Sequence, residues 1–392
     1  MNSSHSLQLN KQIFLIVFAI LCATAATHAD EGIYPKGQLS RMGYQEAAPL
    51  HKAIVLKALK GKTPRLAPTL KLLDSQPAPQ LLPWPVTFEN NQHNLGNNMI
   101  QFQSYGGSDS YFHGGCDLRT AAQADIRTPV AGKLDAGHYG YEVQPDGSMK
   151  KFWTPYPQHG DDMYFEVSVI TDDGLRYEFH HVDRNTLPSA IKQKLDHGNA
   201  RVEAGEIVGH VHNWPITAID GSYYHHTHYN IIAADGTRIN PESVSWALAD
   251  TSAPEIHGVY AVSSKGVVTE LSNGGKAPSP LPAEIIVAAT DKNDPNVYTH
   301  PPTVVELKSA DGKSSGWNFK HTLLDQNGKF PNIHEVFKDS LVLPNGDRLE
   351  TEGDYENNFF LVRLVVPAQA QLPFEIRIED SAGTARVFLI KN

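Results

Sequence analysis

The sequence predicts a mainly β protein, with an antiparallel β-sheet domain over residues 85–250 and an immunoglobulin-like β-sandwich over 251–392. Its length of 392 residues favours two domains plus tails, at about 150 residues per domain. From Val86 onward, short runs of alternating apolar and polar residues are separated by glycine and aspartate turns, which is typical of strands. The apolar face of each strand then has to be buried in a core.

Residues 1–29 have the features of a secretory signal peptide. Lys11 precedes an apolar run over 13–21, and small residues fill 23–29. The apolar run is short for a membrane span, although an uncleaved anchor is the alternative. We expect cleavage after Ala29 and an exported protein, periplasmic or secreted, with no membrane span afterwards. Only Cys116 then remains, so no internal disulfide can form.

Residues 30–84 are expected to form a weakly packed leader or linker, with an inhibitory pro-segment as a further interpretation. The segment is rich in Pro, Lys, Gln and Ala, with one predicted helix over 47–59. Prolines over 77–85 indicate an extended linker.

The sheet domain is predicted from a hairpin and two further strands. Runs over 164–170 and 175–181 flank Asp172-Asp173-Gly174, and Asp-Gly between two alternating runs is a strong hairpin signal. Further strands are predicted over 202–208 and 224–233. The sandwich is predicted from short strands over 259–262, 284–289, 304–308, 359–366, 374–379 and 385–390, without the cysteine–tryptophan signature of antibody domains.

The charge of the chain argues against two classes of partner. The formal net charge is −10 and the pI is about 6.0. Nucleic acids and anionic membranes bind clustered Lys and Arg, so neither is an expected partner.

Histidines and one aspartate form the candidate site. One residue separates His226 from His228 in a predicted strand, so the two side chains share a face and could bind one metal ion. A pair of exposed histidines without a metal is an equally common explanation of this pattern. His113 and Asp117 also share a face if their segment is extended, with two glycines between them that permit close approach of another chain. Cys116 then faces away and is expected to be a buried apolar residue.

A third histidine follows from the predicted hairpin. His181 shares its face with Leu175, Tyr177 and Phe179, whereas His180 shares its face with Arg176 and Glu178. Because the apolar face packs inward, His181 is the candidate site residue, and His180 is expected to face solvent.

These segments together resemble the lysostaphin-like (LytM-type) zinc metallopeptidases, which are cell-wall endopeptidases. The ordered motifs are His113-Gly-Gly-Cys-Asp117, His181-Val182 and His226-Thr-His228, with supporting similarity at 128–132 and 202–209. The resemblance covers roughly residues 100–235 and implies a LytM-like sheet domain.

The resemblance also implies the roles of the site residues. His113, Asp117 and His228 would bind one Zn²⁺, and His181 and His226 would be the catalytic histidines. Three protein ligands leave the fourth position of a tetrahedral zinc for water, as a catalytic site requires. Zinc can bring the pKa of that water toward about 7, and histidines beside it can move protons or stabilise the oxyanion.

The segments around the motifs depart from the family pattern. His226-Thr-His-Tyr-Asn230 replaces the usual His-Leu-His-Phe-Glu, and residues 139–161 form an insertion. Trp153, Tyr156 and Trp214 in these segments are candidate substrate contacts, or they simply pack the loops down. The His159–Asp162 loop carries possible metal ligands, but a solvated loop is the favoured interpretation.

Three functions remain open from the sequence. The leading hypothesis is an exported zinc metalloendopeptidase that cleaves stem peptides or crosslinks of peptidoglycan. The alternatives are a secreted zinc protease that acts on proteins, and a non-catalytic wall-binding or amidase-activating module. The presence of all five key residues argues against the last of these.

Overall fold

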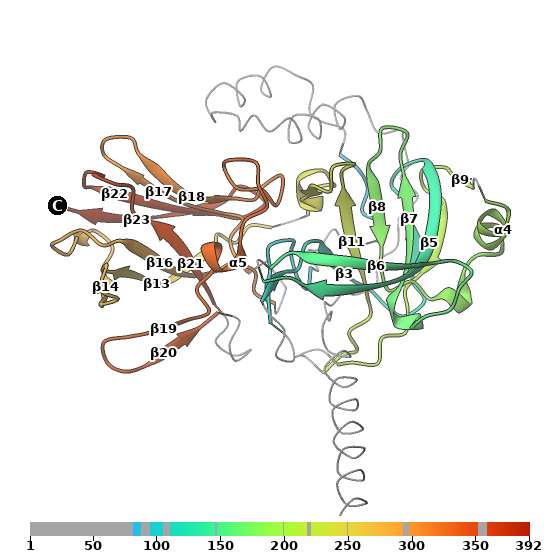
Figure 1. The fold of residues 1–392 in the computed structure, drawn as a ribbon, viewed down its shortest axis with the longest axis horizontal. Coiled ribbons are helices and arrows are strands. Elements are labelled where there is room, and N and C mark those ends of the chain that lie inside the picture. Colours follow the sequence, from blue (N-terminus) through green and yellow to red (C-terminus); the bar gives the residue numbers. More distant parts are fainter. Residues whose placement is uncertain are drawn as a thin grey trace, which may run out of the picture.

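The computed structural model describes residues 81–87, 95–104, 110–145, 147–198, 200–217, 221–248, 250–292, 298–351 and 359–392. The signal segment expected over 1–29 and the helix expected over 47–59 lie outside this set. Within it the chain is mainly β, as the sequence predicts, and forms two bodies side by side (Figure 1). None of the helices in these ranges is long and apolar enough to cross a membrane.

The first body is built on an eight-stranded sheet. The strand order is β12-β11-β8-β7-β5-β6, with β3 also paired to β11 and β9 to β5. The strands are β3 (Cys116–Arg119), β5 (Gly132–Val143), β6 (Met149–Pro155), β7 (Phe165–Ile170), β8 (Arg176–Phe179), β9 (Arg201–Val202), β11 (His226–Ile232) and β12 (Arg238–Ile239). A separate pair joins β4 (Asp125–Arg127) to β10 (Ile207–His210), and short helices α4 (Ser189–His197), η2 (Asp162–Tyr164), η3 (Arg184–Thr186) and η4 (Pro241–Ser243) lie in the connections.

The hairpin predicted around Asp-Gly is confirmed as β7 and β8. Gly174 has φ +88°, the left-handed conformation that the turn requires and that glycine adopts without strain. The prediction of a single strand over 202–208 is wrong, because β9 ends at Val202 and β10 begins at Ile207. Gly205, at φ +87°, turns the chain there, and β9 and β10 pair with different partners.

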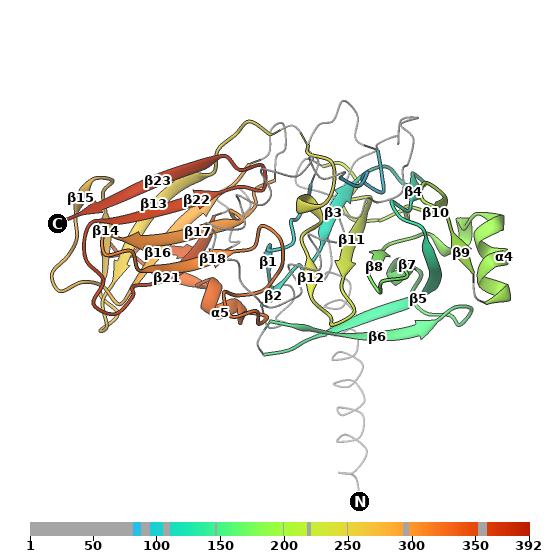
Figure 2. The same cartoon turned by 90° about the horizontal axis from the view of Figure 1, so that it is seen from above.

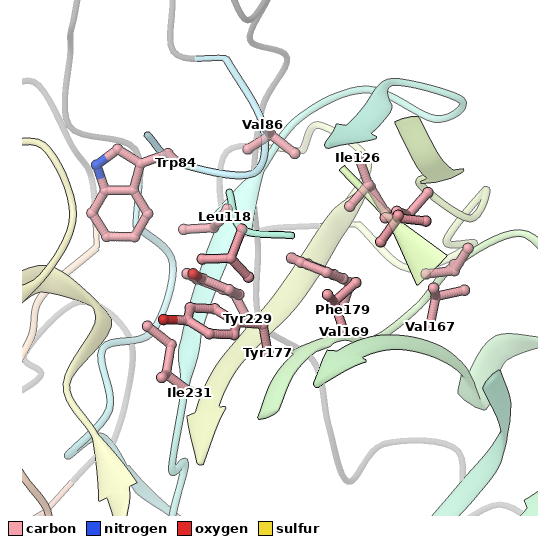
Figure 3. Packing of buried hydrophobic residues seen from close by; sticks show 14 of the residues in the cluster. Trp84, Val86, Leu118, Ile126, Val167, Val169, Tyr177, Phe179, Tyr229 and Ile231 are labelled. Atoms are coloured by element: carbon pink, nitrogen blue, oxygen red, sulfur yellow. The ribbon is translucent and has the colours of Figure 1, made fainter. Parts of the chain in front are cut away.

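The core of this body is aromatic and aliphatic (Figure 3). Tyr177 and Phe179 of β8 pack with Tyr229 of β11, and the rings of Phe179 and Tyr229 are stacked with their centroids 5.6 Å apart. Leu82 and Trp84 are buried in the same core, and the backbone N–H of Leu82 donates to the carbonyl of Val244. The prediction that weak packing extends to residue 84 is therefore wrong, because Leu82 and Trp84 belong to the core of the sheet domain.

The second body consists of two sheets that share one core. Their orders are β14-β13-β16-β21 and β15-β23-β22-β17-β18, and all pairs are antiparallel except β15 with β23. The strands are β13 (Glu255–Val262), β14 (Val268–Leu271), β15 (Gly275–Lys276), β16 (Glu284–Thr290), β17 (Val304–Ser309), β18 (Ser314–Asn318), β21 (Phe360–Val365), β22 (Phe374–Glu379) and β23 (Ala385–Lys391). A hairpin of β19 (Ser340–Val342) and β20 (Arg348–Glu350) and the short helix α5 (Ile333–Val336) complete it.

All six strands predicted for this body are present, and the shorter β14, β15, β18, β19 and β20 were not predicted. Apolar side chains from both sheets fill the space between them, including Val287 of β16 and Ile376 of β22. This packing makes the body a β-sandwich.

One small hairpin joins the two bodies. Strands β1 (Phe102–Gln103) and β2 (Tyr111–Phe112) lie between them (Figure 2). The sequence places this hairpin in the first domain, yet Phe102 and Phe112 are buried in the core of the sandwich. The two bodies are therefore packed against each other through a shared apolar contact.

Candidate metal centre

Two neighbouring strands place an aspartate and a histidine opposite each other. Strands β3 and β11 are antiparallel, and their register pairs Asp117 with His228. Directly opposed residues of an antiparallel pair point to the same face of the sheet, so both side chains lie together. The register, which sequence alone does not reveal, builds this half of the site.

The third residue comes from the turn between β2 and β3. His113 directly follows Phe112, and Gly114 takes φ +83°, which bends the chain toward β3. The Nε2 atom of His113 lies 2.7 Å from Oδ1 of Asp117 and 2.9 Å from Nδ1 of His228. The latter nitrogen is 2.7 Å from the same Asp117 oxygen. Three potential ligand atoms therefore meet at one point, as the sequence predicts.

The hydrogen bonds on the far side of each ring assign the protons. Nδ1 of His113 faces the carbonyl oxygens of Gly115 and Asn98, which can only accept, so this nitrogen carries the proton. Nε2 of His228 faces Oδ1 of Asn230, which also accepts from Arg238. In both neutral rings the nitrogen that faces the centre therefore presents a lone pair.

Burial keeps these rings neutral. His113, Asp117 and His228 are at most 2% exposed. Desolvation lowers the pKa of His113 to about 3 and lowers the pKa of His228 well below its ordinary value. Two nitrogen lone pairs and a carboxylate oxygen directed at one another repel unless a cation lies among them, and together these residues form a group that can hold a metal ion.

The two predicted catalytic histidines lie together beside this group. The ring centroids of His181 and His226 are 4.4 Å apart, and both side chains are fully buried. Nδ1 of His181 donates to the carbonyl of Met163, and Nδ1 of His226 donates to that of Tyr224, each at 2.8 Å. Burial lowers both pKa values well below the ordinary range. Both neutral rings thus present Nε2 as a proton acceptor.

The expectation that His180 faces solvent is wrong. His180 is fully buried, and its ring stacks on that of His228 with centroids 4.9 Å apart. Strand β8 ends at Phe179 and His181 has φ +55°, so strand alternation no longer separates the two histidines. The polar face of β8 is also covered, because Tyr139 of β5 packs on His180 at 4.1 Å.

Behind His180 lies a buried network of charges. Its Nε2 faces Glu166 at 3.1 Å and Glu178 at 3.2 Å, and both carboxylates also bind Lys151 and Arg176. Lys151 and the other cationic neighbours hold the pKa values of Glu166 and Glu178 below the ordinary value despite their burial. Because two side-chain cations already neutralise these carboxylates, the cluster is a salt-bridge network and needs no metal ion.

Two residues that the sequence analysis missed connect this network to the centre. Asn230 donates to Glu178 at 3.0 Å and accepts from Nε2 of His228. Arg238 donates to Oδ1 of Asn230 and to the carbonyl of Gly114. These bonds fix the tautomer and orientation of His228. Asn230 lies on the same face of β11 as His226 and His228, so strand parity was the signal that could have found it.

The candidate substrate contacts fall in three different surroundings. Trp214 is fully buried, and its ring centroid lies 4.4 Å from that of His181 and 5.1 Å from that of His226, so it packs against these two histidines. Half-buried Trp153 lies against Lys151 and Arg176. Tyr156, also half-buried, donates to Asp196. Of the three, only Trp214 is brought to the two histidines by a ring contact in the described structure.

The remaining predictions concern two nearby segments. Cys116 is fully buried in the core, as predicted, and burial raises the pKa of its thiol well above the ordinary value. His159 lies in an exposed loop and accepts from Arg184, while Asp161 caps η2. The solvated-loop interpretation of this segment is therefore confirmed.

Comparison with models of known protein families gives no match, and no curated protein matches the chain.

Proposed function

We propose that this protein is an exported zinc metalloendopeptidase of the lysostaphin-like type that hydrolyses amide bonds in peptidoglycan. The observation that carries the proposal is the convergence of Nε2 of His113, Oδ1 of Asp117 and Nδ1 of His228 on one point, with two neutral histidines beside it. Two histidines and a carboxylate are a ligand set that suits a catalytic zinc. Zinc bound there would supply Lewis acidity toward a peptide carbonyl and toward water.

His181 and His226 supply proton transfer in this proposal. Their Nδ1–H groups donate to backbone carbonyls, so each Nε2 carries the lone pair that would accept a proton from water and return it to the leaving amine. Since burial favours the neutral rings, both remain acceptors across the neutral pH range. When protonated, either ring can also stabilise negative charge on the carbonyl oxygen.

Trp214 supports this pair by position. It is edge-on to His181 and to Tyr164, and its backbone N–H donates to Nδ1 of His225. A buried indole against two imidazoles keeps water away from one side of the rings, which strengthens electrostatic interactions on the other. Peptidoglycan as the substrate, and export, are inferred from the motif resemblance and the signal-like N-terminus.

Digestion of purified peptidoglycan, followed by mass spectrometry of the products, tests the proposal. The mature wild-type protein, His228→Ala and His181→Ala are compared, with zinc content measured on each. We expect amide cleavage by wild type, loss of zinc from His228→Ala, and loss of activity with retained zinc in His181→Ala.

Two outcomes would contradict the assignment. Full activity of His181→Ala removes its catalytic role, and retention of zinc by His228→Ala removes the ligand set. Glycine-rich proteins digested in parallel separate the wall endopeptidase from a secreted protease, because cleavage of these proteins alone would favour the latter.

A further inference from the structure

A short segment of the chain touches both the metal centre and the sandwich. We call residues 95–103 the strap. It runs antiparallel to 111–118, through the β1–β2 pair, the Leu95–Leu118 bridge, and hydrogen bonds from the backbone N–H of His113 to Gln101 and of Asp117 to Asn97. It therefore lies along the segment that carries two of the three candidate ligands.

The strap orients those two ligands directly. Nδ2 of Asn97 donates to Oδ2 of Asp117 at 2.9 Å, on the oxygen that does not face the centre. The carbonyl of Asn98 accepts from Nδ1 of His113 at 3.2 Å. Both asparagines are buried, so these bonds have little competition from water.

The strap itself is anchored in the sandwich. Met99, Ile100 and Phe102 are buried in the sandwich core, and the side chain of Asn98 donates to the carbonyl of Pro301. None of these three apolar residues belongs to the core of the sheet domain. The sandwich therefore fixes the position from which the two asparagines act.

The ligand-bearing segment is anchored in the same way. Phe112, the residue directly before His113, is 1% exposed and packs edge-on against Phe330 at 5.7 Å and Phe319 at 6.2 Å. Both partner rings belong to the sandwich. The backbone of His113 is thus held on one side by the sandwich core and on the other by the turn into β3.

We propose that the sandwich is a working part of the metal centre: through the strap and Phe112, it positions His113 and Asp117 for metal binding. Metal sites tolerate ligand displacements of only about 0.2 Å, so small shifts in these contacts weaken binding. The inference rests on metal binding at the proposed site and assigns the sandwich a role within it.

The test alters the sandwich side of the contact and measures metal binding by the full-length mature protein. Phe330→Ala removes a ring that contacts Phe112 and changes no amino acid of the sheet domain. Phe359→Ala is the matched control, because Phe359 is also a half-buried phenylalanine of the sandwich but packs in a separate apolar cluster, against His257. Phe330→Leu is the conservative variant expected to restore binding.

Zinc dissociation constants come from competition with a chromophoric chelator, and the visible absorption of the Co²⁺ form reports ligand geometry. We expect Phe330→Ala to bind zinc about 10- to 100-fold more weakly, with a changed Co²⁺ spectrum, and Phe359→Ala to match wild type. Wild-type affinity and spectrum in Phe330→Ala would overturn the inference, and so would equal weakening in both variants.

A second variant decides the matter if Phe330→Ala does not fold. Asn98→Ala removes the side-chain bond to Pro301, together with the bond from the backbone N–H of Ile100 within the strap, and keeps the backbone carbonyl that holds His113. Weaker zinc binding supports the inference and unchanged binding overturns it. The two proposals fail differently. A wild-type protein that binds no zinc contradicts the proposed function, whereas zinc binding that is indifferent to these variants contradicts only the role of the sandwich.

Discussion

Gly115, between the two candidate ligands His113 and Asp117, offers a sharp test of the geometry of the proposed metal centre. Its φ is outside the left-handed region, so alanine would adopt the same backbone conformation without strain. A Cβ at this position would lie 2.7 Å from Nε2 of His228 and 2.8 Å from the carbonyl oxygen of Tyr229, and it would also clash with Oδ1 of Asn230. Gly115→Ala therefore displaces the candidate ligand His228 and Asn230, the residue that orients it.

The magnitude follows from the contact distances. Ordinary contacts to a Cβ begin at 3.4 Å, so the imidazole of His228 must move by more than half an ångström. This exceeds the roughly 0.2 Å tolerance of a metal–ligand bond. We expect zinc affinity to fall on the order of 100-fold, with about 1–3 kcal/mol of lost stability from overpacking.

Chelator competition measures the affinity, and urea denaturation measures the stability. Gly140→Ala is the control, since a Cβ there meets nothing within 4 Å. The reasoning is refuted if Gly115→Ala binds zinc with wild-type affinity while Gly140→Ala behaves as wild type.

Three further predictions concern charge and metal. Lys151→Met should lower the free energy of unfolding of the sheet domain by about 3 kcal/mol near pH 7, as measured by urea denaturation. This is the low end of the range for removing one partner of a buried ion pair, because Lys151 is 24% exposed and Arg176 still binds both carboxylates. The pKa values of Glu166 and Glu178 are lowered in the folded protein, so the stability these carboxylates contribute is present above about pH 4.3 and is lost as pH falls through the folded pKa values. The difference in unfolding free energy between Lys151→Met and wild type should therefore become smaller in acid. Burial and neighbouring carboxylates raise the pKa of Asp291 to about 8, so folding stability should decline from about pH 4 to 8, and Asp291→Asn should flatten that decline in thermal melts. Zinc at 100 times its Kd should stabilise the protein by about 2.7 kcal/mol, seen as a lower Tm after EDTA, and an unchanged Tm would contradict metal binding.

Sequence reasoning worked where neighbouring residues share one regular strand. His226 and His228 lie on β11 with Thr227 between them, and their common face is the face of the candidate metal centre. The six sandwich strands were predicted because each is a short apolar or alternating run that lies within a single strand, as in β22 (FEIRIE, alternating) and β16 (EIIVAAT, apolar and buried over most of its length). Two-residue strands such as β1 and β2 carry too few alternations to be recognised.

Sequence reasoning failed for residues whose contacts come from distant segments of the chain. His180 was assigned to solvent because Arg176 and Glu178 share its face, yet Lys151 and Tyr139, from a different hairpin, cover that face. The anchoring of Phe112 in the sandwich has the same origin, because its partners lie more than 200 residues away. Tertiary contacts of this kind decide burial, and no local pattern encodes them.

The burial of Leu82 and Trp84 has a consequence for maturation. The backbone of Leu82 bonds to Val244, and the indole of Trp84 donates to the carbonyl of Trp246, so both residues complete the wall of the sheet domain. Loss of either side chain would open a cavity that costs on the order of 2–5 kcal/mol. A proteolytic cut before residue 82 would leave this wall intact, whereas a cut beyond Trp84 would remove both side chains and lower the free energy of unfolding of the remaining chain.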